Sequence, residues 1–273
     1  MHSVIHNALI SPFLLIFQHR TLTFEMARRE ILDRYAGQVL GVLWMIGHPL
    51  IQVAVYIFIF QVVFQVRIGE SADLPMDYIV YLLSGLLPWL AFQESMTRGT
   101  LVIVGNSNLV KQVVFPLEVL PVKTVLACWA TQLIGTALML GYMVITTGRM
   151  PWTIVLLPLL WAAQCIAMIG VSCLFGAIGA YFRDMKDIVQ VFCVIGVYLM
   201  PICYLPQWVP EILRPFLYLN PFSYMSWCYQ DVCFFGRIAH PWSWPIFLIG
   251  SGAIFVLGFG AFRRLKTYFG NLL

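Results

Sequence analysis

Charge is scarce in this sequence. Only 10% of its 273 residues are Asp, Glu, Lys or Arg, 61% are hydrophobic, and the mean hydropathy is +0.86. A soluble domain carries about 25% charged residues, because polar side chains must cover its core. The composition therefore excludes an ordinary soluble domain, a disordered chain and a partner of nucleic acids. It predicts an all-α polytopic membrane protein.

Motifs for several kinds of chemistry are also absent. None of the four lysines follows a glycine, so the sequence has no P-loop for ATP. It has no H-E-x-x-H motif, and its seven cysteines include no C-x-x-C pair. Asp184 and Asp187 are interrupted by Lys186, which favours a charged turn over a Mg²⁺ site. We expect no cofactor, no metal and no catalytic residue in this chain.

Long charge-free segments predict the membrane spans, because a helix needs about 20 apolar residues to cross the bilayer. The second span continues through Glu94 and Arg98, which have the i, i+4 order that favours a helical ion pair. This intramembrane pair either belongs to a pathway or neutralises itself near the cytosolic end of its helix. The six predicted spans cover about 40–65, 78–104, 123–146, 153–181, 188–205 and 242–262.

The segment 206–236 contains four prolines and is either a seventh span or a re-entrant hairpin. With six spans, twelve of the sixteen Lys and Arg residues share the side of both termini. A seventh span would move the basic cluster at 263–266 to the opposite side. The positive-inside rule therefore favours six spans, cytosolic N- and C-termini and a re-entrant hairpin. Such a hairpin must lie against protein or a water-filled cavity.

Two shorter helices are expected on the cytosolic side. The segment 21–35 predicts an interfacial amphipathic helix rather than a solvated basic tail. Its apolar side carries Phe24, Ala27, Ile31 and Tyr35, and its polar side Glu25, Arg29 and Asp33. The segment 105–115 predicts either a short helix with one apolar face or a turn in the headgroups. For the helix, Asn106 or Ser107 is the expected N-cap and Pro116 the stop. The chain, 1–273, has no internal repeat or linker and reads as one domain.

Four stretches of the sequence together resemble one family. They are Arg28–Trp44 with His48-Pro49-Leu50, then Asn106–Pro121, then Arg183-Asp184 with Pro201–Tyr204 and Asn220-Pro221, and finally Phe262–Lys266. In this order they resemble the permease subunit of type 2 ABC transporters that export polysaccharides such as O-antigen, teichoic acid and capsule. The sequence departs from the family pattern at Gln38, where serine is common, and at Gln112, where a second lysine is common.

The resemblance implies partners and a cargo. It implies a homodimer that encloses a channel, in contact with membrane lipids, and two copies of a P-loop ATPase that hold ATP and Mg²⁺. The cargo would be a polysaccharide on a lipid carrier, commonly undecaprenyl diphosphate, moved outward across the bacterial inner membrane. By resemblance the 105–115 segment is the coupling helix, with the 21–35 helix bracing the same ATPase. The coupling residues are then Asn108, Leu109, Val110, Lys111 and Val113, together with Arg28 and Ile31.

Aromatic side chains make up 15% of the sequence, and ten lie within 204–235. Sugars stack their C–H faces on aromatic rings, so these side chains are candidates for a glycan channel. Anchoring at the membrane interface is the alternative. The predicted channel or gate residues are Tyr56, Phe60, Tyr204, Trp208, Tyr224 and Trp227.

Two other functions stay open on the sequence alone. One is a self-contained secondary transporter or channel, although no series of carboxylates suited to proton coupling is evident. The other is a membrane-embedded lipid-phosphate or glycosyl transferase. A separate P-loop ATPase that binds this chain distinguishes the exporter from both.

Overall fold

The fold is described by a computed structural model for residues 18–63, 76–111 and 115–272. These residues form helices and turns and include no β-strand. Four helical stretches are long and apolar enough to cross a membrane, which confirms a multi-pass all-α protein. They are Gly41–Val63, Val119–Thr147, Trp152–Tyr181 and Ser243–Tyr268, and they match the first, third, fourth and sixth predicted spans.

Each of these four stretches contains one long α-helix, and three include short turns of other helical types. A 3-10 turn and a π-helical turn flank α3, a 3-10 turn precedes α7, and another follows α11. The α6 helix ends where Gly148 adopts a left-handed conformation with φ of +62°, which costs glycine little. The α-helices are α3 (Trp44–Ile57), α6 (Val119–Thr147), α7 (Leu157–Tyr181) and α11 (Ser243–Leu265).

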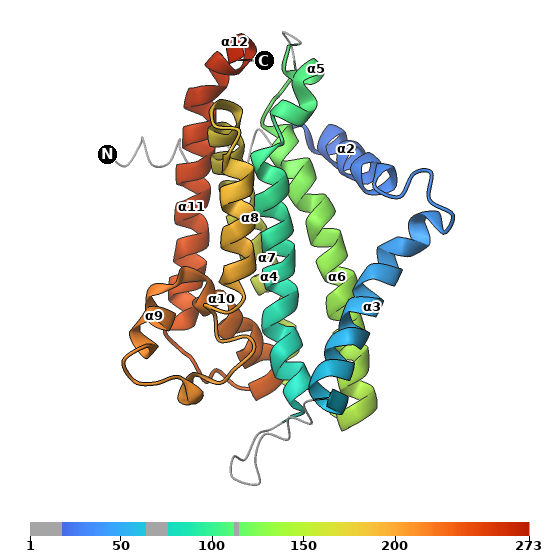
Figure 1. Cartoon of the computed structure of the whole chain (residues 1–273), viewed down its shortest axis with the longest axis vertical. Coiled ribbons are helices and arrows are strands. Elements are labelled where there is room, and N and C mark those ends of the chain that lie inside the picture. Colours follow the sequence, from blue (N-terminus) through green and yellow to red (C-terminus); the bar gives the residue numbers. More distant parts are fainter. Residues whose placement is uncertain (1–17, 64–75, 112–114, 273) are drawn as a thin grey trace.

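The second predicted span is the central helix of the bundle (Figure 1). This helix, α4 (Tyr78–Thr100), has 23 residues and is about 34 Å long. Its side chains are buried almost continuously from Tyr78 to Trp89, where α6, α7 and α10 surround it. It is long enough to cross a bilayer, but its mean hydropathy is lower than that of the four candidate spans, and its last turns carry Glu94 and Arg98.

The fifth predicted span is not one continuous helix. The α8 helix (Met185–Gly196) has 12 residues, about 18 Å, whereas the hydrocarbon core is about 30 Å thick. Gly196 packs so closely on Trp89 that an added Cβ would lie 2.5 Å from the indole ring. Pro201 then lacks the N–H that a continuing helix needs. The prediction of a helix through residue 205 is therefore wrong, and the total of six spans stays a prediction.

Short helices at one end of the bundle occupy the predicted re-entrant segment (Figure 1). Asn220 caps α10 by accepting a hydrogen bond from the backbone N–H of Phe222 at 3.0 Å. The α10 helix packs against α4 and α11, so most of its side chains are buried. The elements are the 3-10 turn Pro206–Trp208, α9 (Arg214–Leu219), α10 (Pro221–Gln230) and the π-helical turn Asp231–Phe235. Their depth in a membrane stays a prediction.

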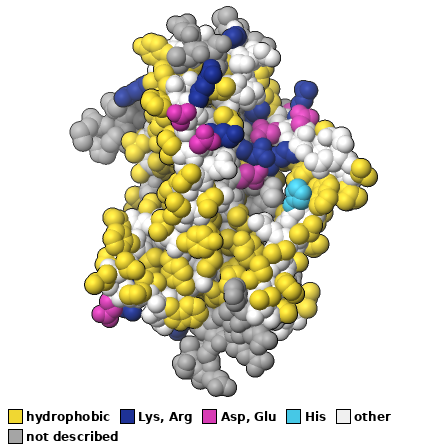
Figure 2. Space-filling view, viewed as in Figure 1, with side chains coloured by type: hydrophobic (Ala, Val, Ile, Leu, Met, Phe, Trp, Pro, Cys, Tyr) yellow, Lys and Arg dark blue, Asp and Glu magenta, His cyan; other side chains and the backbone are white. Residues whose placement is uncertain are grey.

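The segments that the positive-inside rule assigns to opposite sides of the membrane lie at opposite ends of the bundle. At the end with α5 (Ser107–Val110) and α12 (Phe269–Leu272), Lys266 forms an ion pair with buried Glu118. At the other end, the Tyr142 hydroxyl donates to Asp77 at 2.7 Å. Figure 2 shows charged side chains gathered towards one end of this face, and apolar side chains along its middle.

Candidate functional site

The interfacial helix predicted over 21–35 is α2 (Arg20–Asp33), which packs obliquely on α6 near the α5 end (Figure 1). Of its predicted apolar side chains, Ala27 and Tyr35 are buried, Ile31 is half-buried, and Phe24 is 65% exposed. The side that faces the bundle also carries two charged residues, Glu30 and Arg34. Its position at a membrane surface stays a prediction.

Arg34, directly after α2, is largely enclosed between α2, α4 and α6, and only 11% of its side chain is exposed. Its Nη1 donates to Glu94 Oε1 at 2.8 Å, and Arg98 Nε donates to the same oxygen at 2.7 Å. Burial by itself would lower the pKa of Arg34, but the attraction of Glu94, with smaller contributions from Cys128 and Glu30, raises it above its ordinary value. Arg34 is therefore a permanent cation. Glu94 and Arg98 are in contact as the i, i+4 spacing suggests, and Arg34 is the partner that sequence reasoning missed.

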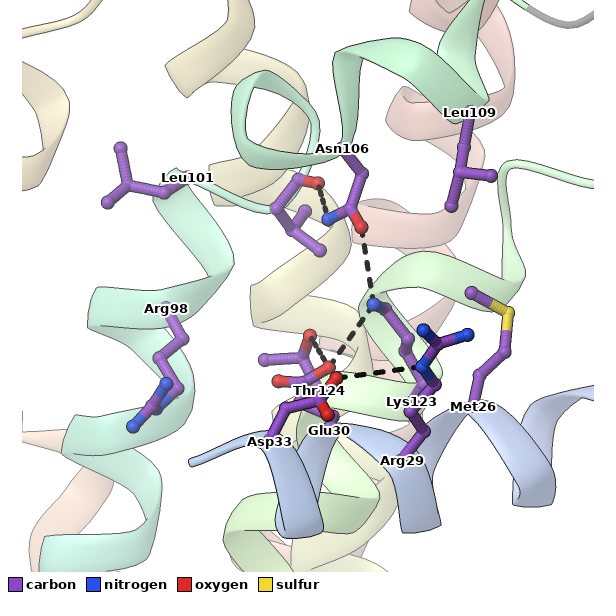
Figure 3. A pocket seen from close by; sticks show the side chains of 11 residues that line it. Met26, Arg29, Glu30, Asp33, Arg98, Leu101, Asn106, Leu109, Lys123 and Thr124 are labelled. Atoms are coloured by element: carbon purple, nitrogen blue, oxygen red, sulfur yellow. Dashed lines mark hydrogen bonds and ion pairs between the residues drawn. The ribbon is translucent and has the colours of Figure 1, made fainter. Parts of the chain in front are cut away.

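A second set of polar contacts ties α2 to α6 and to the segment before α5 (Figure 3). Lys123 lies 3.4 Å from Glu30 Oε2, and Thr124 donates to the same oxygen at 3.3 Å. Lys123 also donates to Asn106 Oδ1 at 3.3 Å, and Asn106 Nδ2 donates to the Val102 carbonyl at 2.8 Å. These contacts connect the segment after α4, the α5 segment, α6 and α2 through side-chain hydrogen bonds and an ion pair, and one of the hydrogen bonds goes to a backbone carbonyl.

These contacts surround a pocket of about 540 Å³ between α2, α4, α5 and α6. Charged and polar side chains of α2 and α6 line one part of it, and Met26, Leu101 and Leu109 supply apolar surface. Figure 3 shows Met26 and Leu109 on the same side of this pocket. We name this group of residues and its pocket the charged junction.

One of the predicted coupling residues, Leu109, lines the charged junction. The short helix is α5, which has four residues, so it is shorter than the predicted 105–115 segment. Asn106 occupies its N-cap position, as one of the two expected residues, but its side chain makes no capping hydrogen bond and bonds to Lys123 and Val102 instead. The predicted residues are placed as follows: Val110 buried, Leu109 and Ile31 half-buried, Asn108, Lys111 and Arg28 exposed, and Val113 outside the described residues.

Three of the predicted channel aromatics, Tyr56, Phe60 and Trp208, form a continuous row of neighbouring rings with Tyr78. We name this row the aromatic file. Tyr56 and Phe60 stack with their ring centres 6.5 Å apart and their planes at 19°. Phe60 lies 5.7 Å from Tyr78, and Tyr78 lies 6.5 Å from Trp208. The file therefore runs from α3 across the start of α4 to the turn at 206–208. Nothing in the sequence separates Tyr78 from the other aromatic residues, so only the structure identifies it as part of this file.

The other predicted gate residues lie apart from this file. Tyr224 and Trp227 contact each other at 5.5 Å, and Trp227 stacks on His240 at 5.4 Å. Trp227 is only 2% exposed, so in the single chain its ring belongs to the core. Tyr204 is half-buried, and its hydroxyl donates to the Tyr198 carbonyl at 3.0 Å.

Two clusters of buried, hydrogen-bonded polar side chains were not predicted from the sequence. Gln132 and Gln164 exchange amide hydrogen bonds at 2.8 and 2.9 Å, and the Tyr229 hydroxyl donates to Gln164. Near α10, Asp231 accepts from His240 and from Trp244 Nε1 at 3.1 Å. Each group is satisfied by neighbouring side chains, which suits a structural role. Among the described residues, no three His, Cys, Asp or Glu side chains are grouped to hold a metal ion.

Known proteins share the sequence pattern along most of the chain. Residues 21–233 match the family model described as ABC-2 type transporter. The O-antigen export system permease protein RfbA of Klebsiella pneumoniae is 27% identical over 254 residues, covering 92% of this chain and 95% of the relative. The RfbA protein of Myxococcus xanthus is 28% identical over 245 residues, covering 89% and 90%. The predicted family is therefore confirmed: this chain belongs to the ABC-2 type transporter family.

Proposed function

We propose that this chain is the transmembrane subunit of an ATP-driven exporter of O-antigen-like polysaccharide. The observation that carries this proposal is its similarity to O-antigen export permeases over nearly the full length of both chains. The fold agrees with it, since several apolar helices surround one central helix. The sequence has no P-loop, so in this proposal a separate ATPase supplies the energy.

In this proposal two chains form a homodimer in the bacterial inner membrane, and each binds one copy of the ATPase. ATP and Mg²⁺ belong to the ATPase, and the cargo is a polysaccharide on a lipid carrier such as undecaprenyl diphosphate. The α5 segment contacts the ATPase, and α2 braces it. The charged junction then transmits movement of α5 to α6 through Lys123, and to α2 through Glu30. The Arg34–Glu94 contact continues the connection to α4.

A secondary transporter is less well supported by the same contacts. Proton coupling needs an intramembrane carboxylate that changes protonation during transport. Glu94 is instead held in ion pairs with Arg34 and Arg98.

Export by the reconstituted complex tests the function. The chain and its ATPase are placed in proteoliposomes loaded with the lipid-linked polysaccharide, and transbilayer movement of the glycan is measured. We expect movement with ATP and none when the P-loop lysine of the ATPase is replaced. Movement without the ATPase would favour a secondary transporter, and glycan transfer to a new acceptor would favour a transferase.

The proposed orientation places both termini and α5 in the cytosol. It is tested with single cysteines at Tyr268 and Arg149, two exposed positions at opposite ends of the bundle, after replacement of the seven native cysteines. In intact cells, an impermeant thiol reagent is expected to label Arg149→Cys and to leave Tyr268→Cys unlabelled until the cells are opened. The reverse pattern would invert the orientation, and labelling of both in intact cells would contradict it.

A further inference from the structure

We propose that α3, α4 and α6 form a subsite that binds the hydroxyl groups of a neutral sugar residue. This inference rests on the proposed export of polysaccharide and names where the glycan meets the chain. The subsite consists of Gln52, Glu94 and Thr131.

The first observation is an unpartnered amide in the middle of an apolar helix. Gln52 lies near the centre of the candidate span Gly41–Val63 and is exposed. Within the described part of the chain, its side chain makes no hydrogen bond. An amide in hydrocarbon without a partner is costly, and polar side chains at membrane depth face a bundle interior or a water-filled cavity. Gln52 therefore indicates a polar path beside α3.

The second observation is the pocket that Gln52 lines. This pocket has a volume of about 210 Å³ and lies between α3, α4 and α6. Its polar lining consists of Gln52, Glu94, Thr131 and Gln132, and Leu87 and Leu90 contribute apolar surface. The amide of Gln132 is already hydrogen-bonded to Gln164, so we assign it to the wall of the pocket and not to ligand binding. Thr131 makes no side-chain hydrogen bond to another described residue, and so it is available to a ligand.

Two arginines hold one carboxylate oxygen of Glu94, and the same residue lines the pocket. Both arginines donate to Oε1, which leaves Oε2 without a partner among the residues that the structure describes. Because Arg34 and Arg98 hold the carboxylate in place, its orientation is fixed before a ligand arrives. The pocket is thus lined by one oriented acceptor, one amide and one hydroxyl.

This set of groups selects among the parts of a lipid-linked glycan. Sugar hydroxyls both donate and accept, and they match a carboxylate acceptor together with an amide and a hydroxyl that do both. The pocket offers a diphosphate no cation, since neither Arg34 nor Arg98 is among its lining residues. A polyprenyl chain would leave all three polar groups unpaired. The subsite therefore suits an uncharged sugar ring, with Leu87 and Leu90 against its C–H face.

The location of the subsite agrees with a path along α3. Gln52 precedes Tyr56 by one helical turn, and Tyr56 begins the file that continues through Phe60 and Tyr78 to Trp208. A sugar bound at Gln52 would thus lie between the charged junction and the aromatic file. Hydrogen bonding at the start and ring stacking further on would allow the glycan to bind first and then slide.

Two substitutions test the subsite in the reconstituted exporter. Gln52→Leu and Thr131→Val keep the side-chain size and remove the hydrogen-bonding groups. Each is expected to reduce glycan export several-fold while leaving ATPase co-purification unchanged. Gln61→Leu is the matched control, because this exposed glutamine belongs to the same span but does not line the pocket. Wild-type export in the same assay separates failure of the subsite from failure of the proposed function. Wild-type export by both pocket variants would overturn the subsite.

Photocrosslinking tests the contact directly and does not depend on activity of a variant. Benzoylphenylalanine is placed at Gln52 or at the neighbouring exposed Ile51 in cells that make the glycan from a radiolabelled hexose. We expect label on the chain at position 52 and none at position 51. A crosslink from position 52 to a second copy of the chain without radiolabel would overturn the proposal, and so would equal labelling at both positions.

Discussion

A methyl group at position 258 is expected to force α7 and α11 apart and to destabilise the bundle. An added Cβ on Gly258 would lie 1.9 Å from the carbonyl oxygen of Gly170. An added Cβ on Gly170 would likewise lie 2.6 Å from the backbone nitrogen of Phe255. The two backbones are therefore in contact. Close packing between small residues is a main attraction between helices in lipid, and backbone atoms cannot move aside as a flexible side chain can.

Overpacking of a core costs about 1–3 kcal/mol and occasionally more. We expect Gly258→Ala to reach the upper end of that range, because the whole helix must shift. The measurement is the thermal midpoint and the monodisperse fraction of the detergent-extracted chain. Gly260→Ala is the matched control, since that glycine is in the same helix with no atom within 4 Å of its added Cβ. Equal stability of the two variants would contradict the close contact between α7 and α11.

The long helices were predictable because apolar length is a local property of the sequence. The span predicted over 153–181 corresponds to the helical stretch Trp152–Tyr181, which begins one residue earlier. The failure at α8 has a tertiary cause, because the fit of Gly196 against Trp89 cannot be read from a charge-free run. Pro201 was a local signal for the end of that helix, and the apolar run around it concealed the signal.

The site was predictable only where its contacts are local. Glu94 and Arg98 are four positions apart, so helical spacing brings them together. Arg34 reaches Glu94 across 60 positions, and Gln132 reaches Gln164 across 32. One sequence does not show which distant polar residues meet. The same limit explains Asn106, whose local role as an N-cap is replaced by a bond to Lys123, 17 positions away.

Leu109→Asp is expected to abolish export, because Leu109 belongs to both the α5 segment and the charged junction. Its side chain is half-buried and lines the 540 Å³ pocket together with Lys123. A carboxylate there would compete for Lys123, which now binds Asn106 and Glu30. It would also remove an apolar contact from the proposed ATPase interface, where a few buried anchors carry most of the binding energy. Loss of one such anchor costs about 2 kcal/mol or more, which is a roughly 30-fold weaker complex.

Two control variants separate the effect on the ATPase from the effect on the pocket. Leu101→Asp places a carboxylate in the same pocket from the end of α4, outside α5. It is expected to retain ATPase co-purification, whereas Leu109→Asp is expected to lose it. Lys111→Ala, at an exposed position after α5, is expected to be milder in both assays, since rim charges contribute little. ATPase co-purification and glycan export are measured for each variant. If Leu109→Asp retains both at wild-type levels, the coupling contact lies elsewhere on the chain.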